Sequence, residues 1–258
     1  MSLAAQTSSA SVVGKITDPT GGVIPGVAIT ITNIGTNQAW KASSSEVGDF
    51  TIPYLQPGRY IMEAKSEGFR SWKQSEFGLE VEQVLRLDVR LELGATTETV
   101  TVTDTPPALN TDSGSRGEVT TTREIEQLPL DGRNFSDLAY LTGGVIPKGD
   151  GGDGAYAVNG ARADNFGFMM DGVNNTQRRN TGAMISPPLE SVQEFKLLTS
   201  GFAAEYGRYA GGMISVATKS GTNRLRGVLY EFLRNDALDA TGYFDGTKSK
   251  LRRNQFGT

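Results

Sequence analysis

The sequence predicts a mainly β protein with a minor α content, in which an N-terminal β-sandwich precedes an α+β domain. Residues 11–94 hold short alternations of apolar and polar side chains separated by turn signals, a pattern typical of a sandwich. The 32 glycines among 258 residues fit turn-rich β structure better than a helical bundle. Helical patterns are confined to residues 118–142 and to a short stretch at 186–192. The length allows two domains of ordinary size.

The composition narrows the classes of function. The chain has no histidine and no cysteine, which removes the commonest general base, the commonest transition-metal ligand and any disulfide framework. The net charge is −4, and basic side chains outnumber acidic ones only after residue 195, by 10 to 5. A nucleic-acid-binding domain usually presents a dense basic face, so we expect no nucleic-acid partner. We also predict that the protein is not an enzyme and needs no metal or cofactor.

Each expected strand of the first region has one buried face. The runs at 12–17, 27–32, 50–54 and 60–64 alternate apolar with polar residues, and glycine, proline or aspartate turns separate them. The clearest strand is 85–93, in which five leucine or valine side chains alternate with four charged ones. We expect these strands to supply the core of the sandwich.

The turns and strands of this region carry a recurrent set of residues: Gly14, Asp18, Pro25-Gly26-Val27, Gly48, Phe50, Leu55, Pro57-Gly58-Arg59-Tyr60 and Gly68-Phe69. The set resembles the carboxypeptidase regulatory-like domain, a transthyretin-like (prealbumin-like) sandwich. Despite its name, the resemblance implies no peptidase activity. Two roles stay open for this domain: a rigid spacer with a packed core, or a module that binds a glycan or a peptide.

Residues 95–117 form the predicted joint between the two domains. Within it, Glu98-Thr99-Val100-Thr101-Val102-Thr103 alternates β-branched residues without large side chains, and Thr105-Pro106-Pro107 ends the alternation. A β-prone segment with so weak an anchor can pair with the exposed sheet edge of another protein. A plain linker strand is the alternative.

The region 118–222 combines short helices with strands. Thr121 followed by Glu124 is a capping-box pattern that starts a helix, and residues 132–141 give a second short helix. A strand is expected at 166–171, where Asp171-Gly172 is a natural turn. The region therefore reads as an α+β domain.

Residues 186–223 hold the most specific pattern of the chain. A short helical start leads into a strand at 192–198, a glycine-rich corner at 205–212 and a second strand at 213–218. The glycines of the corner permit positive φ and a close backbone approach, which a tight connection between strands needs.

Several motifs of this region stand in a fixed order: M-D-G-V at 170–173, S-V-Q-E-F-K at 191–196, Y-G at 206–207 and G-G-M-I-S-V-A-T-K at 211–219. They resemble the plug domain of TonB-dependent outer-membrane receptors, and a sandwich ahead of the plug is similar to the Oar-like branch of that family. Gln193, where the family usually has Glu, and Glu205, where it often has a small residue, depart from the pattern.

The resemblance implies four parts: the sandwich at 11–94, a linker at 95–117, the plug at 118–222 and the start of a transmembrane β-barrel at 223–258. Residues 226–234 alternate as a barrel strand does. Because barrels of such transporters have about 22 strands, we expect this chain to hold only the beginning of one. The remaining C-terminal barrel is therefore an expected partner of the plug.

The resemblance also implies roles for particular residues. Residues Glu98 to Thr103 would be the TonB box, the segment that a TonB-like energising protein grips. Gln177, Arg178 and Arg179 lie in a polar stretch that would form an external loop touching a small ligand (a siderophore, a glycan or a peptide), with a solvated loop as the alternative. The chain would sit at the outer membrane with its N-terminal domain in the periplasm, and its plug would gate energy-coupled uptake. A periplasmic or surface module that binds a glycan or peptide, with no transport role, is the alternative function.

Overall fold

The computed structural model describes residues 9–102, 114–128, 130–147, 156–162, 165–177, 182–201, 206, 209–238, 240–241, 248 and 250–258. The chain separates into two compact units, Met1–Asn223 and Arg224–Thr258, and each is described by itself. Over the described ranges, no helix has both the length and the apolar content needed to cross a membrane.

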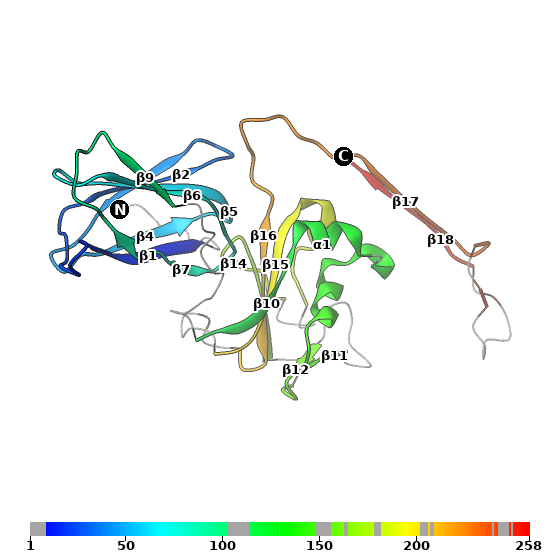
Figure 1. Cartoon of the computed structure of the whole chain (residues 1–258). Coiled ribbons are helices and arrows are strands. Elements are labelled where there is room, and N and C mark those ends of the chain that lie inside the picture. Colours follow the sequence, from blue (N-terminus) through cyan, green and yellow to red (C-terminus); the bar gives the residue numbers. More distant parts are fainter. Residues whose placement is uncertain are drawn as a thin grey trace, which may run out of the picture. The chain divides into compact units, whose positions relative to one another are not determined.

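The N-terminal part of the first unit is a two-sheet β-sandwich (Figure 1). One sheet has the order β4-β1-β7, with β8 also paired to β1, and the other has the order β3-β2-β5-β6-β9. The strands are β1 (Ala10–Thr17), β2 (Ala28–Asn33), β3 (Ala39–Ser43), β4 (Asp49–Leu55), β5 (Gly58–Lys65), β6 (Ser71–Leu79), β7 (Val84–Arg86), β8 (Val89–Arg90) and β9 (Thr99–Val102).

Side chains from both sheets meet in one apolar core. The burial of β1 alternates strictly along the strand, and the inward positions of β2 and β5 are likewise buried. Tyr60 lies at the centre of an aromatic group with Trp40 and Phe77, at ring-centroid distances of 5.9 and 6.3 Å. The sandwich and the mainly β fold predicted from the sequence are confirmed.

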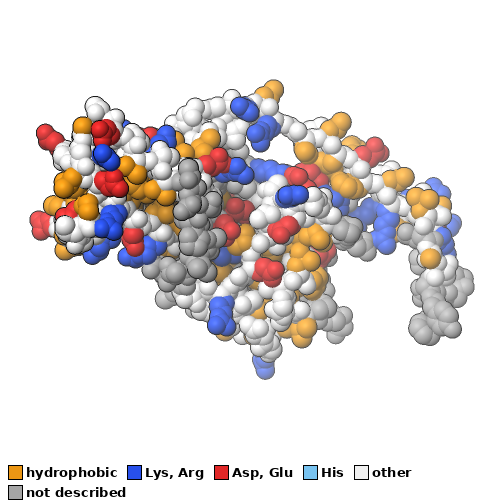
Figure 2. All heavy atoms as spheres, viewed as in Figure 1, with side chains coloured by type: hydrophobic (Ala, Val, Ile, Leu, Met, Phe, Trp, Pro, Cys, Tyr) orange, Lys and Arg blue, Asp and Glu red, His pale blue; other side chains and the backbone are white. Residues whose placement is uncertain are grey.

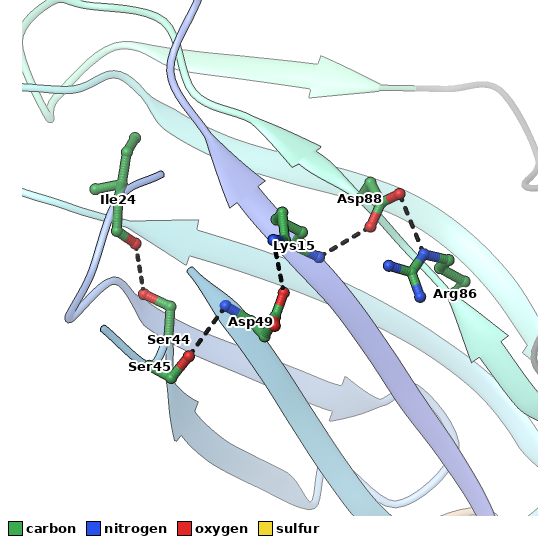
Figure 3. A network of polar contacts seen from close by, with 7 residues as sticks. All are labelled: Lys15, Ile24, Ser44, Ser45, Asp49, Arg86 and Asp88. Carbon is green, nitrogen blue, oxygen red and sulfur yellow. Dashed lines mark hydrogen bonds and ion pairs between the residues drawn. The ribbon is translucent and has the colours of Figure 1, made fainter. Parts of the chain in front are cut away.

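The predicted strand 85–93 is divided into β7 and β8, which both pair in parallel with β1. Between them, the Asp88 carboxylate accepts the backbone N–H of Lys15 at 2.9 Å and contacts the guanidinium of Arg86 at 3.3 Å (Figure 3). A side chain therefore takes the place of a backbone acceptor at this step. The ladder is interrupted there, although the alternation of apolar side chains continues.

Gly14 lies where the backbone of Leu87 approaches β1 most closely. A Cβ on residue 14 would stand 2.0 Å from the Leu87 carbonyl oxygen and 2.8 Å from the ring of Phe50. We therefore expect Gly14→Ala to lower the free energy of unfolding of the sandwich by about 1–3 kcal/mol, the usual cost of overpacking a core.

Denaturation followed by tryptophan fluorescence would measure this effect, because the chain's two tryptophans, Trp40 and Trp72, both lie in the sandwich. The matched control is Gly78→Ala in β6, where no atom lies within 4 Å of the added Cβ. Equal denaturation midpoints for the two variants would contradict the steric argument.

The rest of the first unit is an α+β domain built on a five-stranded sheet of order β10-β15-β16-β13-β14 (Figure 1). Its two longest strands, β15 and β16, are antiparallel neighbours, whereas β13 and β16 run parallel. The strands are β10 (Arg116–Thr121), β13 (Phe166–Met170), β14 (Val173–Asn174), β15 (Val192–Ser200) and β16 (Gly212–Thr218), and a separate pair is formed by β11 (Val145–Pro147) and β12 (Tyr156–Val158).

One α-helix and several 3-10 turns accompany this sheet: α1 (Thr122–Gln127), η1 (Asp131–Arg133), η2 (Phe135–Leu141) and η4 (Leu189–Ser191). The predicted capping box is confirmed, because the Glu124 carboxylate accepts both the backbone N–H of Thr121 at 2.8 Å and its hydroxyl at 2.9 Å. These bonds hold the pKa of Glu124 below its ordinary value. Phe135 and Leu138 of η2 belong to the same apolar core as Phe195 and Leu197 of β15.

The turn predicted at Asp171-Gly172 joins β13 to β14. Both residues have positive φ, 48° and 78°, as a tight two-residue hairpin turn requires. The Asp171 carboxylate accepts the backbone N–H and the hydroxyl of Thr218, each at 2.8 Å. The turn is therefore fixed to the end of β16 as well as to its own strands.

The second unit contains an antiparallel pair of strands, β17 (Tyr230–Asn235) and β18 (Arg252–Gly257). The sequence predicted the first of these from residue 226, four residues earlier than the strand begins. Apolar side chains of this pair remain open to solvent, including Leu233 and Phe256, which are 62% and 77% exposed. Because consecutive residues of a strand point to opposite faces, Phe232 and Leu233 leave apolar surface open on both faces of the pair.

Candidate functional site

The segment Glu98–Thr103, which we call the box segment, does not lie free in a linker. Its residues Thr99–Val102 form β9, which pairs in parallel with β6 at one edge of the sandwich (Figure 1). The sequence assigned these residues to the joint, whereas the structure adds them to the sheet. Thr103 lies outside the described residues.

Polar contacts fasten the start of this strand to the sandwich. The backbone N–H of Ser71 donates to the Glu98 carbonyl at 2.8 Å, and the Ser71 hydroxyl donates to the Thr96 carbonyl at 2.7 Å. The guanidinium of Arg70 contacts the Glu98 carboxylate at 2.6 Å and that of Glu92 at 3.2 Å. Both carboxylates are more than half exposed, so these ion pairs contribute little to stability.

The two faces of β9 differ in what they offer a partner. Thr99 and Thr101 are exposed, whereas Val100 and Val102 are half-buried, and Val102 packs against the core of the sandwich. Thr99 and Thr101 are therefore the residues of β9 that face the solvent most fully. The valines and Glu98, which distinguish the segment from an ordinary threonine-rich strand, are engaged by the sandwich.

A second polar contact joins the turn at residues 80–83, between β6 and β7, to strand β15. The ammonium of Lys196 donates to the carbonyl of Val81 at 2.9 Å and lies 3.4 Å from that of Glu82. The Glu194 carboxylate accepts the backbone N–H of Val81 at 2.6 Å. We call Glu194, Lys196 and this turn the β15 clamp.

Strand alternation explains why the clamp residues point away from the core of the α+β domain. Phe195 and Leu197 enter that core from one face of β15, so Glu194 and Lys196 lie on the other face. Lys196 is only 4% exposed. Burial raises the pKa of Glu194 to about 7 and lowers the pKa of Lys196 from its ordinary value.

The predicted ligand loop is anchored by an asparagine that the sequence analysis did not single out. Asn175 is buried, and its side-chain amide donates to the Ile185 carbonyl at 2.7 Å while its oxygen accepts the Ile185 N–H at 2.8 Å. The Tyr209 hydroxyl contacts Thr176 and Asn174, each at 3.0 Å. These bonds close the base of the loop between residues 174 and 185.

Of the three predicted ligand residues, Gln177 is exposed, and its backbone N–H donates to the Gly182 carbonyl at 2.8 Å. Arg178 and Arg179 lie outside the described residues. The structure thus shows an ordered base for this loop. The ligand role of Gln177, Arg178 and Arg179 stays a prediction.

The acidic side chains and the charged surface offer no further candidate site among the described residues. Within the described part of the chain, no group of three or more His, Cys, Asp or Glu side chains could hold a metal ion. Figure 2 shows acidic and basic side chains interspersed over the visible face of the sandwich. That face carries no extended patch of one sign, so its charge pattern does not single out a strongly charged partner.

The clamp is the feature that sequence reasoning missed. Glu194 and Lys196 alternate with apolar residues, and such a pattern predicts a strand with a solvent-facing polar side. Their partners stand more than a hundred positions earlier in the chain. No local signal in the sequence could have connected them.

Two family models match this chain, one near its N-terminus and one at its C-terminus. Residues 11–92 match the model of the carboxypeptidase regulatory-like domain, and residues 217–258 match that of an outer membrane beta barrel domain. The TonB-dependent transporter Oar of Myxococcus xanthus is 27% identical over 263 residues, covering 96% of this chain and 23% of that protein. The chain thus spans about a quarter of the length of this relative.

Solved structures align with part of the chain at low identity. A putative carbohydrate binding protein from Bacteroides uniformis is 22% identical, with a TM-score of 0.28 and coverage of 32% of this chain and 40% of that one. The major pilin subunit BcpA of Bacillus cereus is 15% identical, with a TM-score of 0.29 and coverage of 32% and 28%. Neither similarity bears on function. The two family matches and the similarity to Oar relate this chain to the TonB-dependent outer-membrane proteins.

Proposed function

We propose that this chain is the periplasmic and plug part of a TonB-dependent outer-membrane transporter, and that it gates energy-coupled uptake of a small ligand. In this role the sandwich at 11–94 stands on the periplasmic side, residues 118–222 are the plug, and residues from 223 begin the barrel. The chain performs no catalysis in this role. A TonB-like protein grips the box segment and supplies the force that rearranges the plug.

One observation carries the proposal: the similarity to Oar extends over 96% of the chain and joins the two family matches in one alignment. A sandwich module alone would explain only the first match. The region between them also keeps the order of the plug motifs, with Asp171-Gly172 in a tight turn and residues 212–218 as β16. This order supports a plug in the middle of the chain.

The box segment has the chemistry that mechanical coupling needs. An extended strand offers its backbone N–H and C=O groups to a partner strand, and these bonds resist a pull along the strand direction. Thr99–Val102 is already extended and stands at a sheet edge. The segment can thus pair with a strand of the energising protein without a change of secondary structure.

The test is binding of this chain to the purified periplasmic domain of TonB, measured by calorimetry or surface plasmon resonance. We expect deletion of Glu98–Thr103 to abolish binding. Thr101→Pro removes one backbone N–H and is expected to weaken binding about tenfold or more, the effect of losing roughly 1.4 kcal/mol. Thr101→Ala is the matched control, because it keeps the backbone donor, and we expect it to bind within about twofold of the parent chain.

The result would also separate the proposed role from its rival. A folded parent chain that does not bind TonB would overturn the coupling role of the box segment. Saturable binding of a glycan or peptide by residues 1–95, together with that negative result, would identify a binding module without a transport role.

A further inference from the structure

The box segment is held by the sandwich through β9, which pairs with β6 and forms the edge of the sheet. Four residues of β9 pair with Ser71 to Gln74 of β6, and Glu98 is engaged by Arg70 and Ser71 just before the strand begins. The features by which a partner would recognise this segment, its two valines and its glutamate, are therefore partly covered or engaged by the sandwich.

We infer that the box segment is paired with β6 when no partner is bound, and that an energising protein must displace β9 from β6 in order to bind the segment. The inference rests on the proposed function, because it specifies how the segment becomes available to its partner. The sandwich then acts as a competitor for the same strand. Its affinity for β9 sets how much of the segment is free.

The pairing of β9 with β6, which we call the dock, has the features of a contact that opens easily. β9 is four residues long, and none of its side chains is fully buried, whereas β5 and β6 each place several buried side chains in the core. Short strands with little buried apolar area open at low free-energy cost compared with the core. The ion pairs of Arg70 are exposed, so they add little to the stability of this pairing. Local release of β9 therefore does not require the sandwich to unfold.

A strand addition to the outer edge of the docked β9 is the competing geometry. In that case the partner would meet mainly the exposed Thr99 and Thr101 and the outward half of a four-residue backbone. Val100 and Val102 would remain half-covered by the sandwich, so a partner could contact only part of each side chain. The side-chain orientation therefore favours displacement.

A disulfide between β6 and β9 tests the inference. Lys73 and Thr101 are register partners, and neighbouring strands lie about 4.8 Å apart, within the range that a disulfide spans. The chain has no cysteine of its own, so Lys73→Cys with Thr101→Cys introduces the only pair. The matched control is Thr30→Cys with Lys41→Cys, a register pair between β2 and β3 at the opposite edge of the same sheet.

Binding to the periplasmic domain of TonB is then compared for oxidised and reduced chains. We expect the β6–β9 disulfide to form in the folded protein and to weaken binding at least tenfold, with full recovery on reduction. The β2–β3 disulfide is expected to leave binding unchanged. Arg70→Ala, which loosens the dock, is expected to strengthen binding about threefold.

The possible outcomes distinguish the inference from the function on which it rests. Equal binding of the oxidised and reduced β6–β9 variant would overturn displacement and favour addition to the outer edge. Failure of the disulfide to form in the folded chain would overturn docking itself. Absence of binding by the reduced variant and by the unmodified chain alike would overturn the proposed coupling to TonB, whatever the disulfide shows about the dock.

Discussion

Replacing Lys196 by methionine is expected to lower the free energy of unfolding of the first unit by about 3 kcal/mol. The ammonium of this residue is buried and donates to the carbonyls of Val81 and Glu82. Methionine fills a similar volume but donates no hydrogen bond, so both carbonyls lose their charged donor. The half-buried Glu194 carboxyl also loses the positive charge of Lys196 on its own strand.

Urea denaturation followed by far-UV circular dichroism would measure the loss, and hydrogen exchange would locate it at the amides of β15 and of the turn at residues 80–83. Lys219→Met is the matched control. That lysine makes an exposed ion pair with Glu126 at 3.0 Å, so its replacement is expected to change stability by about 0.5 kcal/mol or less. If both variants unfold at the same urea concentration as the parent chain, the clamp contributes no measurable stability.

The fold could be predicted from the sequence wherever one side of a strand is buried in a regular alternation. β1, β2 and β5 follow that rule, and their positions were predicted to within a few residues. β6 was missed for a physical reason. Its pairing with β5 shifts register between Tyr60 and Met62, which places an extra residue in β6 and breaks the period of two. The same strand is the one that docks the box segment.

The candidate site was predictable only in part. The box segment was recognised by its β-branched residues and its place between two domains, but its docking depends on contacts that no local pattern encodes. Arg70 is an ordinary surface residue in the sequence, and only the fold brings it against Glu98. Similarly, Asn175 stands in a polar stretch that predicts a solvated loop, whereas its buried amide closes the base of that loop.

The stability of the first unit is expected to depend on pH through Glu194. Burial raises the pKa of this carboxyl from 4.5 to about 7 in the folded protein. Below about pH 4.5 the group is protonated in both the folded and the unfolded chain, so it makes no difference to stability there. Between pH 4.5 and 7 the unfolded chain has released the proton while the folded chain retains it. Stability therefore falls as pH rises through this window and levels off above pH 7.

The expected size of this loss is about 3–3.5 kcal/mol, since each unit of pKa difference corresponds to about 1.4 kcal/mol. Lys196 faces Glu194 from the same strand, and Glu80 faces it from the turn. Their charges also act on the carboxyl, so the pH profile of a single chain would not isolate Glu194. A comparison with Glu194→Gln does, because glutamine keeps an oxygen that can accept the Val81 N–H and has no proton to release.

Glu194→Gln is expected to match the parent chain within about 0.5 kcal/mol at pH 4.5 and to exceed its stability by up to about 3–3.5 kcal/mol at pH 8. Urea denaturation at pH 4.5, 6 and 8 gives both values. Glu118→Gln, an exposed site on the neighbouring strand β10, is the control and should differ from the parent by the same small amount at every pH. A stability difference between Glu194→Gln and the parent that stays constant from pH 4.5 to 8 would show that this carboxyl is not desolvated. The clamp would then be a solvated contact, and the pH at which the sandwich holds β15 most firmly would have to be set by other groups.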